Sequence, residues 1–140
     1  MKILILHGPN LNLLGQRETM IYGSKTQNEL FDSIKTHFPE INFSFFQSNH
    51  EGVLIDKIHE SLDIVHALII NPGAFAHYSY AIRDAISAIA LPTIEVHLSD
   101  IFNREEFRKN LVISDVCQEA ISGKGIDGYI EAVNKIKDIL

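Results

Sequence analysis

A glutamate and a histidine two residues apart, Glu95 and His97, form the clearest chemical pair in the chain. They lie in the apolar run PTIEVH at 92–97, which is typical of a strand. Side chains two apart in a strand share a face, so we expect the carboxylate beside the imidazole. Such a carboxylate favours the protonated imidazole, and the pair is suited to general acid catalysis. The alternative is an incidental ion pair at a partly exposed strand end.

A second group of polar side chains lies between Gly8 and Gly23, after the first apolar run. This connection is far longer than the usual 2–6 residues between a strand and a helix, which predicts an active-site lid at about residues 16–24. It contains Asn10, and it also contains Arg17 close to Tyr22. A guanidinium near a phenol stabilises the phenolate, which is a base. The alternative is a solvated surface loop.

Further polar side chains follow the apolar run that ends near Ile70. Asn71 falls where this run becomes a loop, and His77 comes shortly after it. Taken alone, His77 is more often structural than catalytic. Arg83 and Asp84 fall on the polar side of the next predicted helix, where they are either solvated or reach a neighbouring subunit.

The residues after His97 offer groups that bind anions. Backbone amides and a hydroxyl come from Leu98 and Ser99, and a short predicted helix carries Arg104 and Arg108 on one side. Arg108 is suited to hold a carboxylate with two parallel hydrogen bonds. The alternative is that both arginines pair only with the intervening glutamates.

Alternating apolar runs and helix-period segments must position these residues. The predicted strands are Lys2–His7, Ile41–Gln47, Ile64–Ile70, Pro92–His97 and a short Val116–Ser122. The predicted helices are Thr26–Phe38, Val53–Leu62, Ser79–Ala90 and Ile126–Leu140. This alternation predicts an α/β fold, a flavodoxin-like five-stranded parallel sheet of order 2-1-3-4-5 with helices on both faces. Ligands of such sheets bind beyond the carboxyl ends of the strands, where the residues above lie.

Length and composition exclude several classes of protein. The 140 residues predict one domain over 1–140, and 46% hydrophobic and 21% charged residues are typical of a folded chain. No apolar run is long enough to cross a membrane. The net charge of −6 gives no basic surface for nucleic acid. A single cysteine, Cys117, excludes an internal disulfide and a thiolate metal cluster, and it favours a cytoplasmic location.

Several catalytic motifs are absent. The chain has no glycine-rich dinucleotide or P-loop motif, no spacing typical of metal ligands, and no lysine at the predicted strand ends for a Schiff base.

In ordered blocks over almost its whole length, the chain resembles the type II 3-dehydroquinate dehydratases of the shikimate pathway. The blocks are GPNLNLLGQRE with Tyr22-Gly23, QSNHEG at 47–52, INPGA at 70–74, PTIEVHLS at 92–99, REEFR at 104–108 and GKGIDGY at 123–129. The resemblance implies a flavodoxin-like fold and dehydration of 3-dehydroquinate to 3-dehydroshikimate through an enolate, without a metal or cofactor.

The resemblance also implies roles for individual residues. Tyr22 is implied as the base that removes the C2 proton, and His97 as the acid that protonates the departing C1 hydroxyl, with Glu95 beside it. Arg17 stabilises the transition state, and Asn10 holds a water against the enolate oxygen. The implied substrate-binding residues are Asn71, His77, Asp84, Leu98, Ser99 and Arg108.

The resemblance implies assembly as well: a homododecamer of four trimers, with Asp84 directed towards a neighbouring subunit's site. The chain departs from the family pattern at Thr19 in the lid, at Tyr78 and at Asp100. The family serves either biosynthesis or quinate catabolism.

A flavin-binding domain and a phospho-acceptor receiver are the rival interpretations of this fold. The loop after the first strand has no Ser or Thr before Thr19 to hold a flavin phosphate. A receiver needs acidic residues where this chain has His7 and Asn71. Both observations favour the enzyme over the two binding domains.

Overall fold

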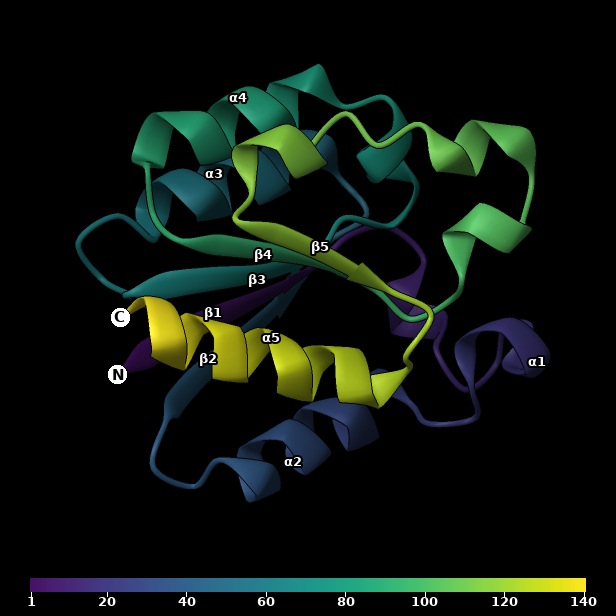
Figure 1. Ribbon diagram of the computed structural model, residues 1–140, viewed down its shortest axis with the longest axis horizontal. Coiled ribbons are helices and arrows are strands. Elements are labelled where there is room, and N and C mark those ends of the chain that lie inside the picture. The colour runs from purple at the N-terminus through teal and green to yellow at the C-terminus, as the bar shows by residue number, and fades with distance from the viewer.

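The computed structural model describes residues 1–140 and is built on one sheet of five parallel strands (Figure 1). The strands lie in the order β2-β1-β3-β4-β5, which confirms the predicted topology. Their bounds are β1 Lys2–His7, β2 Asn42–Gln47, β3 Ala67–Asn71, β4 Thr93–His97 and β5 Glu119–Ser122.

Two helices cover each face of the sheet, as the alternation of elements predicts (Figure 1). Helices α2 (Gln27–His37) and α5 (Ile126–Ile139) lie on one face, and α3 (Glu51–Glu60) and α4 (Tyr80–Ile89) lie on the other. Helix α2 begins with a capping box, in which Thr26 and Glu29 exchange hydrogen bonds between side chain and backbone. No helix is long and apolar enough to cross a membrane.

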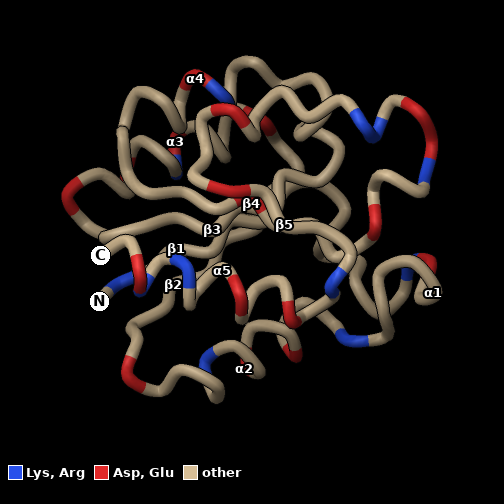
Figure 2. Tube along the Cα trace, in the orientation of Figure 1, with Lys and Arg blue, Asp and Glu red and all other residues tan.

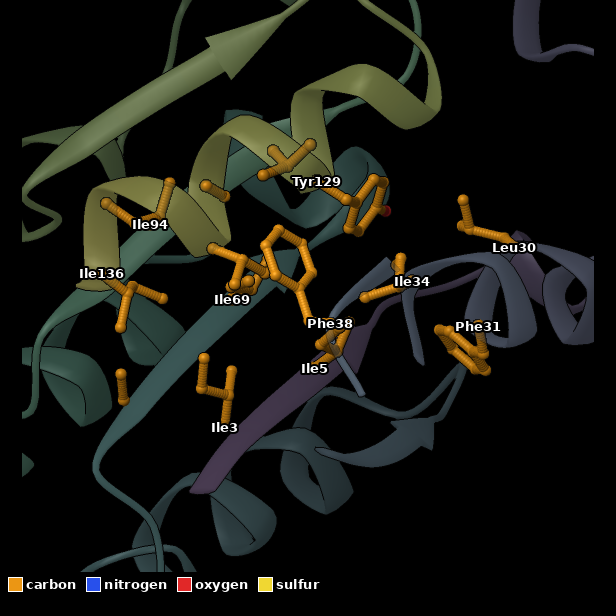
Figure 3. Close-up of a cluster of buried hydrophobic side chains, with 14 of the residues drawn as sticks. Ile3, Ile5, Leu30, Phe31, Ile34, Phe38, Ile69, Ile94, Tyr129 and Ile136 are labelled. Carbon is orange, nitrogen blue, oxygen red and sulfur yellow. The ribbon is translucent and has the colours of Figure 1, made fainter. Parts of the chain in front are cut away.

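The strand residues alternate between two hydrophobic layers. In β1, Ile3 and Ile5 pack with α2 and α5, whereas Leu4 and Leu6 pack with α3 and α4. Figure 3 shows the first layer, in which Tyr129 of α5 lies among aliphatic side chains from the sheet. Each fully buried aliphatic side chain contributes about 1.5–3 kcal/mol, so the two layers hold the strand ends firmly in register.

Most elements lie within two residues of their predicted bounds, and two strands begin three residues later than predicted. Strand β3 begins at Ala67 rather than Ile64, because the amides of Ile64 and Val65 close the turn after α3 on the Ser61 carbonyl. Strand β5 begins at Glu119 rather than Val116, since Ser114–Val116 form the 3₁₀ turn η5.

Two further differences lie around the cavity described below. The short helix predicted at 104–108 is a 3₁₀ helix, η4 (Glu106–Lys109), which begins two residues later, and another, η3 (Ile101–Asn103), ends just before Arg104. The lid includes a short helix, α1 (Thr19–Tyr22), that periodicity did not indicate.

The carboxyl ends of all five strands point to one end of the molecule, where α1 and the η3–η4 segment also lie (Figure 1). Basic residues lie on either side of α1 in the chain and on the η3–η4 segment (Figure 2). The loops after β1 and β3 touch, because a Cβ at Gly8 would lie only 2.2 Å from the Pro72 carbonyl oxygen. Only glycine permits this approach, so the loop after β1 starts beside the loop that carries His77.

Candidate active site

A cavity of about 100 Å³ opens where the strands end, which is room for a small molecule rather than a dinucleotide. The lid, the loop after β3, the end of β4 and the η3–η4 segment all line it. Its lining includes Arg17, Arg104 and Arg108 but no Asp or Glu. The chain carries a net charge of −6, so these arginines gather positive charge locally, as an anionic ligand requires.

Tyr22 lies between two of these arginines. Arg104 Nη1 donates a hydrogen bond of 2.7 Å to the Tyr22 hydroxyl, and the Arg17 guanidinium carbon lies 3.8 Å from the centre of the phenol ring. Ser99 Oγ, 3.2 Å from Arg104 Nη1, fixes Arg104 in turn. Both cations lie where they can stabilise negative charge that develops on the Tyr22 side chain, and Arg104 is in direct contact with the oxygen.

Asn10 lies in the loop after β1 and has a left-handed backbone conformation, with φ of 71°. Asn tolerates this region better than most residues, and such strain is common at functional sites. Its amide donates to Asn49 Oδ1 at 3.0 Å, and its carbonyl accepts a hydrogen bond from Arg17 at 3.5 Å. Because only its backbone is engaged within the chain, the Asn10 side chain is free to meet a ligand or a water in the cavity.

Glu95 and His97 form the predicted pair at the end of β4. Glu95 Oε2 lies 2.6 Å from His97 Nε2, and Glu95 is fully buried. The second carboxylate oxygen, Oε1, accepts a 2.7 Å hydrogen bond from Ser114 Oγ of η5. Since Nε2 of His97 faces Glu95, Nδ1 is the nitrogen that remains to give a proton to a ligand.

His77 lies near His97, with ring centres 6.3 Å apart. Its Nδ1 is 3.0 Å from the Asn110 carbonyl oxygen, and a carbonyl can only accept, so Nδ1 carries the proton. Burial lowers the pKa of His77, and the nearby His97 and Arg108 lower it further. A neutral His77 leaves Nε2 as an acceptor for a hydroxyl group.

The remaining anion-binding groups are Arg108 and the turn formed by Leu98 and Ser99, which also line the cavity. Arg108 lines the cavity and pairs through Nε with Glu105, so the predicted pairing and the predicted contact with the cavity both occur. The carbonyls of Leu98 and Ser99 accept hydrogen bonds from the amides of Gly125 and Gly123, which hold this turn in place.

Nearly all residues expected at the site from the sequence line this one cavity. They are Asn10, Arg17, Tyr22, Asn71, His77, His97, Leu98, Ser99 and Arg108, with Glu95 directly behind His97. Asp84 does not join them, because it is exposed on α4 of the same chain.

The residue that sequence reasoning missed is Arg104, which contacts the Tyr22 hydroxyl. The four-residue spacing of Arg104 and Arg108 predicts that both lie on one side of the same short helix. It was therefore as good a reason to expect Arg104 at the site as Arg108.

Two of the departures from the family pattern lie away from the cavity lining. Asp100 is exposed and accepts a hydrogen bond from Asn103, and Tyr78 is exposed against the edge of Phe75. Thr19 is the first residue of α1 in the lid.

Comparison with known proteins places the chain among enzymes. Residues 1–137 match the family described as Dehydroquinase class II. A protein of Caldicellulosiruptor saccharolyticus, named 3-dehydroquinate dehydratase, is 56% identical over 99% of this chain and 98% of its own length. A protein of the same name from Thermotoga petrophila is 48% identical over 98% of this chain and 95% of its own length.

Solved structures agree with this comparison. The type II dehydroquinase of Butyrivibrio crossotus superposes with a TM-score of 0.95 at 45% identity, over 98% of this chain and 97% of that one. A dehydratase-like protein of Bifidobacterium longum, at 24% identity and a TM-score of 0.69, shares the fold.

Proposed function

The chain belongs to the class II dehydroquinase family, and from this membership we infer that it dehydrates 3-dehydroquinate to 3-dehydroshikimate in the shikimate pathway. The observation that carries this inference is the arrangement of Tyr22 and His97 in one cavity that also gathers three arginines. Such an elimination needs a base, an acid and a group that stabilises an enolate, and the substrate carries a carboxylate.

Proton removal is assigned to Tyr22. Its phenolate, held by Arg104 and Arg17, takes the proton from C2 of the substrate, next to the ketone. The electron pair of the broken C–H bond moves into the enolate. A water held by Asn10 donates to the enolate oxygen, and a preorganised donor of this kind contributes about 3–4 kcal/mol.

Loss of water is assigned to His97. The enolate re-forms the ketone and pushes the hydroxyl off C1, while His97 Nδ1 gives that hydroxyl its proton. Glu95 holds the imidazolium that does so, and Ser114 holds Glu95. The released water takes its hydroxyl from C1 and its proton from His97, and the C2 proton held by Tyr22 restores the histidine by way of solvent.

Substrate binding uses the rest of the cavity. The Arg108 guanidinium and the Leu98 and Ser99 amides are assigned to the substrate carboxylate, and Asn71 and His77 Nε2 to its other polar groups; all these residues line the cavity. No cofactor takes part in this scheme.

Assembly and location extend the proposal. We assign to Asp84 a role in a neighbouring subunit's site, because the family resemblance implies it and Asp84 is exposed and absent from the lining of its own cavity. This requires a homo-oligomer, which by family resemblance is a dodecamer of four trimers. A cytoplasmic location agrees with the lone thiol of Cys117, whose pKa burial raises to about 12.

The experiment that tests this function adds 3-dehydroquinate to the purified protein and follows the ultraviolet absorbance of the conjugated product. We expect absorbance to rise without added metal or cofactor, and the protein to be colourless. A yellow protein without dehydratase activity would indicate the flavin-binding alternative, and phosphorylation by a phosphodonor would indicate the receiver.

A further inference from the structure

A buried chain of hydrogen-bonded side chains lies beneath the cavity, and of its members only Asn71 lines the cavity and takes part in the scheme above. His7 and Asn71 are register partners at the carboxyl ends of β1 and β3. Tyr129 of α5 bridges them: its hydroxyl oxygen is 2.8 Å from His7 Nε2 and 3.1 Å from Asn71 Nδ2. Beyond His7, the side chain of Gln27 lies 2.9 Å from Nδ1.

The direction of these hydrogen bonds follows from their chemistry. Asn71 Nδ2 donates to the Tyr129 oxygen, because Asn71 Oδ1 accepts from the Gly73 amide. The single Tyr129 proton therefore points to His7 Nε2, and His7 Nδ1 donates to Gln27 Oε1. Burial lowers the pKa of His7 to about 4 and raises the pKa of Tyr129, so both side chains are neutral at pH 7.

Every member of the chain has one arrangement that satisfies it. His7 and Tyr129 are fully buried, and the Tyr129 ring belongs to the layer drawn in Figure 3. A reversed Asn71 amide would place an NH₂ group against the Gly73 amide and a carbonyl against a hydroxyl that has no proton left to give. The hydrogen bonds of Tyr129 and Gly73 therefore fix the Asn71 side chain in one orientation. In that orientation the second Nδ2 proton is free to be donated to a ligand in the cavity.

We propose that Tyr129, oriented by His7, is a positioning residue that holds the Asn71 amide ready for the substrate. The proposal rests on the function inferred above, since Asn71 lines the cavity that receives 3-dehydroquinate. Tyr129 itself is absent from the cavity lining, so it acts through Asn71 alone.

The test is a double-mutant cycle on KM and kcat for 3-dehydroquinate. Tyr129→Phe keeps the ring in the core and removes only the hydroxyl. We expect KM to rise about three- to tenfold, the range of one hydrogen bond, while kcat stays within about twofold. In the Asn71→Ala background, Tyr129→Phe should raise KM no further, because the residue through which it acts is gone.

Two further variants complete the design. Tyr80→Phe, at an exposed tyrosine of α4, removes the same atom elsewhere and should leave KM unchanged. If Tyr129→Phe fails to fold, the double variant Tyr129→Phe/His7→Leu also removes the unpaired partner and should show the same rise in KM.

An equal rise in KM in both backgrounds, or a lower melting temperature with normal KM, would overturn the positioning role. An inactive wild type would instead contradict the inferred function, so the two failures are distinguishable.

Discussion

The guanidinium of Arg104 donates a 2.7 Å hydrogen bond to the hydroxyl of Tyr22, although the two residues are 82 positions apart in the chain. Arg17, the nearer in sequence, lies over the ring face instead. The two arginines therefore act on Tyr22 differently, one at the oxygen and one through the π-system.

This difference predicts the effect of Arg104→Ala. A hydrogen bond to a charged group contributes about 1.5–3 kcal/mol, so we expect kcat at neutral pH to fall about 10- to 100-fold. Steady-state kinetics at neutral pH measure this loss. Lys109→Ala, at an exposed cation of η4, is the matched control, and equal losses in the two variants would contradict the account.

The Ser114–Glu95–His97 chain predicts a graded loss of turnover. Glu95→Gln removes the negative charge beside His97 Nε2, and with it the group that holds the histidine as it acts as an acid. We expect kcat to fall strongly. Ser114→Ala removes one hydrogen bond to Glu95 and should lower kcat about two- to tenfold. A Glu95→Gln kcat that matches the wild type would refute this role.

Burial of His7 predicts that acid weakens the fold. The folded protein holds the pKa of His7 at about 4, below the ordinary value of 6.5. Between these values the unfolded chain binds one more proton, so the free energy of unfolding falls as pH drops from 6.5 to 4. The loss from this group is about 3 kcal/mol.

Urea denaturation at a series of pH values measures this loss. His7→Gln keeps an acceptor for Tyr129 and cannot titrate, so its stability should fall less steeply over the same interval. Parallel curves for the two proteins would show that His7 does not cause the loss.

Asp84 predicts that assembly and activity are linked. It is exposed on α4 and lies outside its own chain's cavity, whereas Arg83 is tied to Asp115 and the Val112 carbonyl. We expect a dodecamer by light scattering and a raised KM for Asp84→Ala. Asp63→Ala, in the turn after α3, should change neither quantity. A fully active monomer would exclude a site shared between subunits.

The fold follows from strongly periodic apolar patterns in the sequence. The run KILILH predicts β1 to the residue, and the helical spacing of Leu30, Ile34 and Phe38 predicts α2. Because parallel strands place their carboxyl ends together, the residues after each strand converge as expected. The Glu95–His97 contact followed from a period of two alone.

Irregular segments could not be predicted in the same way. A 3₁₀ turn carries no repeating apolar pattern, so the path of residues 101–116 was not evident. Contacts that join distant segments, such as Arg104 to Tyr22 and Asn71 to Tyr129, depend on that path and on the docking of α5. The sheet brings the site residues together, and these contacts set the orientation of their side chains.

The most direct test of the account is the rate of 3-dehydroshikimate formation by Tyr22→Phe. The ring and its stacking on Arg17 remain in this variant, and only the group assigned as base is lost. General base catalysis is worth about 10²–10⁴-fold, so kcat should fall by at least that range while the variant still binds 3-dehydroquinate. A Tyr22→Phe enzyme that forms product at close to the wild-type rate would contradict the assignment.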